Sequence, residues 1–227
     1  MQGYAICSTG RTGSNWLCEL LTSTRLLGRP LEYFDGAARR LLTDPAYPDD
    51  PAEQIQRVLT MGTTPNGVYG LKVFPWHVDR IQAQVRWTDA LPNLHFVHLV
   101  RDDVLGQAIS LCRVDQTGRF RSPQSESQAP WYDPEAIRRN IHLFVRANAR
   151  WTAFFARAGV EPLRLVYEEI IRDPQRAADR VSDLLQIART RVDLAQVEQS
   201  MMRDEQSEDW RRRFIAEFGD TNTVDQL

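Results

Sequence analysis

A turn near the start of the chain, residues 8–15, gathers the side chains best suited to hold an anion. Gly10 and Gly13 allow positive φ angles and a close backbone approach to a ligand, and Arg11 adds a permanent positive charge. An apolar run precedes the turn and a helix-periodic run follows it, so the backbone amides converge on a helix N-terminus. The alternative is an ordinary turn in which serine and threonine only cap the helix. The residues predicted to bind the anion are Gly10, Arg11, Thr12, Gly13, Ser14 and Asn15.

The same turn lacks the residues of a nucleoside-triphosphate site. That kind of loop reads Gly-x-x-x-x-Gly-Lys-Ser/Thr, with the lysine on the terminal phosphates and the hydroxyl on magnesium. Here Gly10 and Gly13 are only three positions apart, and Ser14 is followed by Asn15 and Trp16. The turn therefore favours a phosphate or sulfate group over a magnesium triphosphate.

Lys72 is a second candidate because it is the only lysine among 28 basic residues. Its ammonium is a compact point charge that an arginine cannot always replace. Lys72 stands near the end of the apolar run 68–74, and His77, whose ring titrates near neutral pH, follows closely. The alternatives stay open: the single lysine survived by chance, and His77 faces solvent at the start of a helix.

A further anion site is suggested by Arg101, which directly follows the apolar run 94–100, and by Ser110 on the next helix-periodic segment. A helix rises about 1.5 Å per residue, so the two lie roughly 12 Å apart along the chain and can hold one extended ligand between them. The competing interpretation is that Arg101 pairs with Asp102 or Asp103 and that Ser110 only packs.

The elements that must position these residues are short apolar runs that alternate with helix-periodic segments. Strands are predicted at 4–7, 68–74, 94–100 and 163–167. Helices are predicted at 16–21, 52–61, 77–87, 103–117, 134–158, 174–187, 192–201 and 207–218. The alternation predicts parallel βαβ units and a three-layer α/β/α, P-loop-like domain with a central, mainly parallel sheet. Ligands bind at the carboxyl ends of such strands, where the 8–15 turn, Lys72 and Arg101 all fall.

Length and composition limit the class of protein. The 227 residues fit one α/β domain spanning 1–227. A net charge of −2 and a pI near 6.1 argue against a nucleic-acid-binding surface. Neither a membrane span nor a secretory signal is recognised, so we expect a cytoplasmic protein. Cys7, Cys18 and Cys112 are expected to be buried thiols, and no spacing suggests a zinc site.

Four motifs together carry a family resemblance. They are Ser-x-x-Arg-x-Gly-Ser at 8–14, Gly-x-Pro-x-Glu-Tyr-Phe at 28–34, Thr-Pro-Asn-Gly-Val-Tyr-Gly-x-Lys at 64–72, and Arg-x-Asp-x-x-x-Gln-Ala-x-Ser at 101–110. With these motifs in this order, the chain resembles the bacterial trehalose 2-sulfotransferase family over most of its length. The resemblance implies a homodimeric sulfotransferase that uses 3′-phosphoadenosine 5′-phosphosulfate (PAPS) as donor and no metal. It also implies that the acceptor is a hydroxyl of a small molecule, a sugar or a glycolipid.

The resemblance assigns the donor to residues already singled out. Residues 10–15 would hold the 5′-phosphosulfate, and Arg101 and Ser110 would bind the 3′-phosphate. Sulfuryl transfer resembles loose phosphoryl transfer, which needs in-line positioning and charge stabilisation more than covalent catalysis. Arg11 would stabilise the charge on the bridging oxygen as the bond breaks.

On the acceptor side, the resemblance places Glu32 at the family's general base and Lys72 at a matching lysine. Lys72 would contact the transferring sulfuryl group or the acceptor, and His77 is the second candidate base. Arg29 departs from the trehalose enzymes, which carry an acidic residue in that loop. Because arginine cannot accept hydrogen bonds from sugar hydroxyls, trehalose as the acceptor is in doubt. Arg29 either favours a negatively charged acceptor or points to solvent.

The segment 118–134 is long and without periodicity, and it carries Trp131 and Tyr132. It is expected to cover the site, with aromatic rings stacked on a sugar or on adenine, unless the two rings only anchor the segment to the core. Two functions from other classes stay open. They are a P-loop-type small-molecule kinase and a non-catalytic nucleotide-binding protein.

Overall fold

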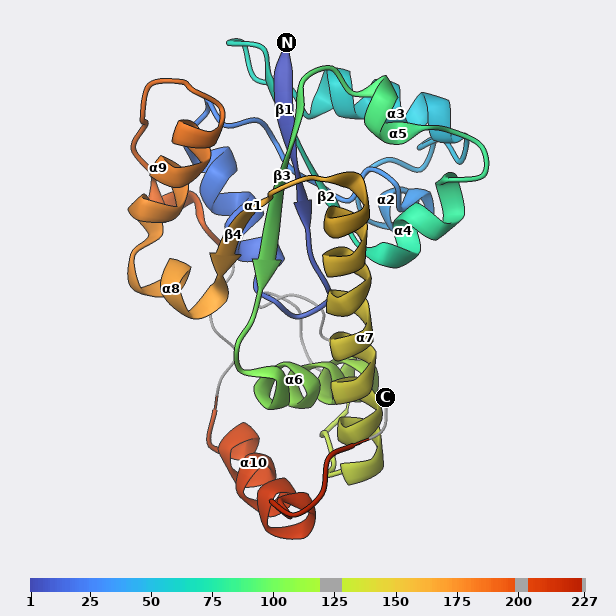
Figure 1. Ribbon diagram of the computed structural model, residues 1–227, viewed down its shortest axis with the longest axis vertical. Coiled ribbons are helices and arrows are strands. Elements are labelled where there is room, and N and C mark those ends of the chain that lie inside the picture. Colours follow the sequence, from blue (N-terminus) through green and yellow to red (C-terminus); the bar gives the residue numbers. More distant parts are fainter. Residues whose placement is uncertain (119–127, 199–203, 226–227) are drawn as a thin grey trace.

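A four-stranded parallel sheet forms the centre of the computed structural model, which describes residues 1–118, 128–198 and 204–225. The strands are β1 (Gln2–Cys7), β2 (Val68–Val73), β3 (Leu94–Val100) and β4 (Leu163–Val166), in the spatial order β2-β1-β3-β4. All four run toward the end of the sheet beside α6 (Val104–Thr117), as Figure 1 shows. The predicted strands are confirmed, and their carboxyl ends meet where the predicted ligand site lies.

Helices cover both faces of the sheet and give the predicted three-layer α/β/α, P-loop-like architecture. One face packs against α1 (Ser14–Ser23), α8 (Tyr167–Arg172) and α9 (Pro174–Leu184). The other packs against α3 (Pro51–Met61), α4 (Pro75–Ile81), α5 (Trp87–Ala90) and the second half of α7 (Pro134–Ala158). Side chains of β1 alternate between the two clusters, with Tyr4 and Ile6 on one face and Ala5 and Cys7 on the other.

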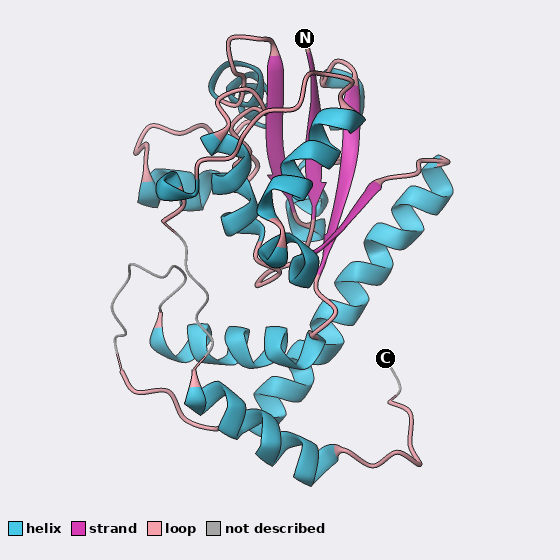
Figure 2. Ribbon diagram, turned by 90° about the vertical axis from the view of Figure 1, so that its left-hand side faces the viewer, coloured by secondary structure: helices cyan, strands magenta, loops and turns pink. Residues whose placement is uncertain are grey.

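A third apolar cluster lies beyond the carboxyl end of the sheet, where α6, the first half of α7 and α10 (Glu205–Phe218) pack together (Figure 2). Helix α7 joins this cluster to the sheet, because Ile137 and Phe144 belong to the third cluster while Trp151 and Phe155 pack on the sheet. Its bounds agree with the sequence: Asp133 accepts a hydrogen bond from the Ala136 amide, Pro134 follows, and the helix ends at a glycine in the left-handed conformation.

The structure corrects the helix predicted at 192–201. Of its described residues, only a 3₁₀ turn, η1 (Leu194–Gln196), is helical, and residues 199–201 lie outside the described part. The backbone amide of Val192 donates to the Gln175 side chain and that of Asp193 to the Ser23 hydroxyl. Val192 and Val197 pack on the cluster around α1. Tertiary hydrogen bonds thus take the place of helical ones.

Other boundaries also differ from the prediction. The segment 77–87 divides into α4, which begins earlier at Pro75, and the separate α5. Helices α2 (Gly36–Leu42) and α8 are short and were not predicted, since neither is long enough to show a clear apolar period. Within 1–118, 128–198 and 204–225, no helix has both the length and the apolar character needed to cross a bilayer.

Candidate active site

The 8–15 loop links β1 to α1 and has the backbone of an anion cradle. Gly13 has φ 77° and stands at the N-terminus of α1, and Arg11 has φ 60°. A Cβ on Gly13 would come within 2.3 Å of the Tyr167 ring, so this position requires glycine for both its conformation and its space. The amides that open α1 therefore face a preformed turn, the arrangement that favours phosphate or sulfate.

Buried side chains brace this loop from within and from behind. The Ser8 and Thr12 hydroxyls lie 2.6 Å apart, and the Thr12 hydroxyl donates to the Thr9 carbonyl at 3.0 Å, so it stiffens the loop. The Gln107 amide on α6 donates to the Thr9 hydroxyl (2.8 Å), and Trp151 Nε1 on α7 donates to the Ser8 carbonyl (2.8 Å). The sequence prediction assigned no role to Gln107 or Trp151. The one available signal was that Gln107 stands inside the Arg101–Ser110 motif.

Arg11, Arg101 and Ser110 come together beside this loop, although they are far apart in sequence. Arg11 Nε donates to Ser110 Oγ at 3.0 Å, and Arg101 Nη1 donates to the Arg11 carbonyl at 3.2 Å. Burial and the neighbouring charge of Arg101 lower the pKa of Arg11 to about 10. Two guanidinium groups held this close repel one another, and a bound oxyanion relieves that repulsion.

The turn after β3 holds Arg101 in place. Its guanidinium lies 5.0 Å from the centre of the Tyr167 ring, and Glu168 accepts the backbone amides of Asp102 and Asp103, each at 3.1 Å. Arg101 is also 3.5 Å from Asp103, so the ion pair that was the alternative to ligand binding does form. However, Asp103 is held more closely by Arg211, at 2.6 Å. Arg101 therefore keeps donor capacity for a ligand.

Glu32 and Lys72 form an ion pair at 2.5 Å on the other side of the loop. Lys72 is 3% exposed and Glu32 24% exposed, and the Lys72 ammonium also donates to the Asn15 side chain. The pair exists because the segment 28–34 runs along β2, where the Lys72 amide donates to the Leu31 carbonyl at 2.9 Å. Burial acts to raise the pKa of Glu32, but the Lys72 ammonium outweighs it and the pKa lies below its ordinary value.

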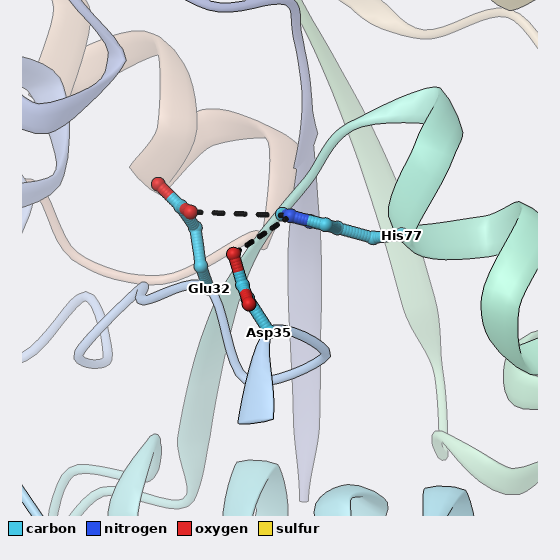
Figure 3. A group of neighbouring side chains, drawn as sticks. All are labelled: Glu32, Asp35 and His77. Carbon is cyan, nitrogen blue, oxygen red and sulfur yellow. Dashed lines mark ion pairs between the residues drawn. The ribbon is translucent and has the colours of Figure 1, made fainter. Parts of the chain in front are cut away.

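His77 is buried beneath Glu32 and Asp35, and both carboxylates point toward its ring (Figure 3). Its Nδ1 accepts the Phe74 amide at 3.3 Å, and its Nε2 lies 3.7 Å from Asp35 and 3.9 Å from Glu32. With Nδ1 accepting, the neutral ring carries its proton on Nε2. Nε2 therefore faces the two carboxylates beyond hydrogen-bond distance, and His77 as the second candidate base stays a prediction. The nearby His77 ring is the main cause that lowers the pKa of Asp35 to about 2.

The ligand atoms of Glu32, Asp35 and His77 lie within 4.8 Å of one another, close enough to approach a single cation. The Lys72 ammonium already supplies a positive charge to Glu32, and the His77 proton faces both carboxylates. Of the three groups, Glu32 is already neutralised by Lys72, and the expectation of metal-independent chemistry stays a prediction.

A cavity of about 200 Å³ opens beside Glu32, Lys72 and Asn15. Its wall also includes Arg39 of α2, and it runs along α1 from Asn15 to Ser23. Arg29 is exposed and is not part of this wall, so the solvent-facing alternative for that residue fits the structure. The other residues that line the cavity are Cys18, Glu19, Thr22, Ser23, Pro30, Leu31 and Gln196.

The predicted site residues thus form two groups joined by the 8–15 loop, one at Arg11 and one at Asn15. The segment 118–134 was predicted to cover the site, but its described aromatic residues do not contact the site residues named above. Tyr132 packs 6.0 Å from Trp210 of α10 and its hydroxyl donates to Glu217, while Trp131 is 54% exposed. Tyr132 therefore anchors the segment to α10, and residues 119–127 lie outside the described part.

The fold and the glycine-containing loop before α1 place the chain among the P-loop-like α/β proteins. The Stf0 sulphotransferase family model matches residues 3–217, and the chain belongs to that family. It is 31% identical to trehalose 2-sulfotransferase of Mycobacterium tuberculosis over 214 residues, which cover 75% of this chain and 79% of the relative. The enzyme of the same name from Mycolicibacterium smegmatis is 29% identical, with the same coverage.

A solved structure has the same fold. The crystal structure of a sulfotransferase from Alicyclobacillus acidocaldarius superposes with a TM-score of 0.50 at 16% identity, covering 96% of this chain and 92% of the other. The family membership makes this protein an enzyme that transfers sulfuryl groups. The resemblance inferred from the four motifs is confirmed.

Proposed function

We propose that this sulfotransferase moves the sulfuryl group of PAPS to a hydroxyl of a small-molecule, sugar or glycolipid acceptor without a metal. The observation that carries the proposal is the position of Lys72, which binds both Glu32 and Asn15. Lys72 therefore links the Glu32 carboxylate, which can accept a proton, with the 8–15 loop, which can hold a phosphosulfate. A base and an anion site in direct contact are what this transfer requires.

The donor is assigned to the 8–15 loop and the arginine cluster. Residues 10–15 would bind the 5′-phosphosulfate through the α1 amides, and Arg101 and Ser110 would bind the 3′-phosphate. Arg11 contacts Ser110 from within the loop and therefore reaches both ends of this assembly. Its charge would stabilise the phosphate oxygen that takes up the electron pair when the sulfur–oxygen bond breaks.

Glu32 would act as the general base. The acceptor oxygen forms its bond to sulfur while its proton passes to the Glu32 carboxylate, and 3′-phosphoadenosine 5′-phosphate (PAP) leaves. The lowered pKa of Glu32 keeps this group ionised at neutral pH, and Lys72 holds it in place. The His77 ring lies beside this carboxylate, with Nε2 3.9 Å from a Glu32 oxygen. His77 thus becomes a positioning residue in this scheme.

The names of the two mycobacterial relatives support a carbohydrate as the acceptor. The acceptor would bind in the cavity beside Glu32. Arg29 has no place in that wall, so the substitution seen in the sequence does not decide between trehalose and another acceptor.

Calorimetry with PAP in the presence of EDTA tests the donor assignment. We expect PAP to bind without magnesium, because the site consists of amides and arginine side chains. Stabilisation by magnesium-ATP combined with no response to PAP would point instead to the kinase alternative. PAP binding with no transfer to any of a broad panel of hydroxyl compounds would point to a non-catalytic nucleotide-binding protein.

Sedimentation velocity tests the predicted homodimer.

A further inference from the structure

Arg39 on α2 is buried in a way that is unusual for an arginine. Its side chain is 5% exposed, and its Nε atom is buried without a hydrogen-bond partner. No ion pair of Arg39 occurs among residues 1–118, 128–198 and 204–225. A buried charge without a counter-charge is costly, so a protein that keeps one has a reason outside its own stability.

The adjacent Arg40 shows the ordinary arrangement for comparison. Its Nη1 lies 2.7 Å from an Asp49 carboxylate oxygen and 3.0 Å from the Tyr47 carbonyl oxygen, and its side chain is one third exposed. Two consecutive arginines of one short helix are therefore treated differently. One is satisfied at the surface, and the other is turned inward.

Arg39 points inward and lines the same cavity as Glu32 and Lys72. The other charges of this wall are already engaged. Lys72 neutralises Glu32 at 2.5 Å, and the Glu19 carboxylate accepts the backbone amide of Glu198 at 2.9 Å. Arg39 is thus the cation of the cavity whose charge no ion pair among the described residues offsets.

The nearby tyrosines do not supply a negative charge that would neutralise Arg39. The Tyr33 hydroxyl donates to the Arg29 carbonyl at 2.8 Å, and the Tyr47 hydroxyl donates to the Tyr33 carbonyl at 2.9 Å. Burial raises the pKa of Tyr47 to about 12, so it stays neutral at any ordinary pH. Among the described residues, no anion lies within ion-pair distance of Arg39.

We propose that Arg39 binds an oxyanion, a carboxylate or a phosphate, carried by the acceptor whose hydroxyl faces Glu32. The inference rests on the proposed function and makes it more specific, because it selects acidic acceptors over neutral ones. A guanidinium presents parallel N–H donors that match such a group, and a low-dielectric wall strengthens the contact. Arg39 is a specificity-determining residue in this account.

Three probes of one ring type separate the possibilities: glucose, glucuronate and glucose 6-phosphate. Binding is measured by calorimetry with PAP at saturation, so that the donor site is filled and cannot take the phosphate. We expect at least one acidic probe to bind about tenfold or more tightly than glucose. This gain in affinity corresponds to one hydrogen bond to a charged group. Which acidic probe gains distinguishes the carboxylate from the phosphate.

The variants Arg39→Gln and Arg40→Gln form a matched pair. Arg39→Gln should lose the preference for acidic probes, and Arg40→Gln should keep it. Arg39→Lys, which retains the charge without the planar fork, should keep part of it. The melting temperature of Arg39→Gln without ligand should be unchanged or higher, because an uncompensated buried charge is removed.

Equal binding of the three probes to the unmodified protein, including no binding of any, would overturn the inference. A preference that survives in Arg39→Gln would also overturn it. These outcomes are distinct from failure of the proposed function, which shows as absence of PAP binding before any probe is added.

Discussion

The two sides of the 8–15 loop handle charge in opposite ways. On the Arg11 side, two guanidinium groups are held close together and are linked through the Arg11 carbonyl and the Ser110 hydroxyl. On the Asn15 side, Glu32 and Lys72 neutralise one another. The first side thus places two cations next to each other, whereas on the second the Glu32–Lys72 pair is neutral and Arg39, in the wall of the same cavity, is the cation that no ion pair among the described residues offsets. In the proposed scheme, the first side would bind the charged donor and the second would activate the acceptor hydroxyl.

Glu32→Gln is expected to have the largest effect, because it removes the proposed base and leaves the arginine side intact. Turnover should fall about 10²- to 10⁴-fold, with PAP affinity nearly unchanged. Sulfuryl transfer from PAPS and calorimetry with PAP give the two readings. The exposed Glu53→Gln on α3 is the control. Undiminished turnover in Glu32→Gln would place the base elsewhere and remove the contrast between the two sides.

Arg101→Met tests the opposite side. Loss of a charge-assisted contact should weaken PAP binding by about ten- to hundredfold, since hydrogen bonds to charged groups contribute roughly 1.5–3 kcal/mol. The acidic-probe preference at Arg39 should not change, because it belongs to the other side. Calorimetry with PAP measures the effect, and the exposed Arg157→Met is the control. Equal PAP affinity of both variants would contradict the assignment of the arginine cluster to the donor.

Gly13→Ala probes the loop that separates the two sides. The substitution forces alanine to φ 77° and brings its Cβ within 2.3 Å of the Tyr167 ring. We expect a stability loss of about 1–3 kcal/mol and weaker PAP binding. Gly159→Ala is the matched control, since its φ is 62° but no atom lies within 4 Å of the added methyl. Equal losses for both variants, measured by urea unfolding, would mean that only the backbone angle matters.

The smallest expected effect concerns pH, and it belongs to the Asn15 side. The pKa of Asp35 is lowered to about 2 by His77, and that of Glu32 lies below its ordinary value. The unfolded chain therefore takes up protons first as the pH falls below about 5. The stability that these carboxylates contribute is present above their ordinary pKa and is lost as the pH falls toward 2. Urea unfolding at pH 6 and pH 3 should show a smaller difference for Asp35→Asn, and an unaltered difference would contradict this.

Local sequence was sufficient to single out the loop and Arg101 on the Arg11 side, because each is carried by a short motif. The contact between Arg11 and Ser110, 99 residues apart, was not predicted. The turn 8–15 with its two glycines, and Arg101 at a strand end, depend on adjacent residues and on the rule that parallel strands end together. The three-layer architecture followed from the same alternation of strands and helices. These features need no knowledge of distant side-chain packing.

The remaining details depend on contacts between distant segments. The bond from Trp151 to Ser8 spans 143 residues, and nothing in the apolar face of α7 marks that indole as a brace. Likewise, Arg39 and Arg40 are adjacent residues of the same type, so the sequence does not distinguish them. Packing buries the Arg39 side chain and leaves Arg40 to pair with Asp49. The proton on His77 depends on a backbone amide that the ring accepts. Such choices are made by tertiary structure, which periodicity does not record.

The single lysine gives the protein one built-in chemical reporter. Lys72 carries the only ε-amino group in 227 residues, and its ammonium is engaged by Glu32 and Asn15. An acylating reagent therefore has no background of surface lysines, and its rate at this one amine reports how often the pair opens. Attachment to a sensor surface through a lysine is also unsuitable, because the only lysine lies inside the candidate site.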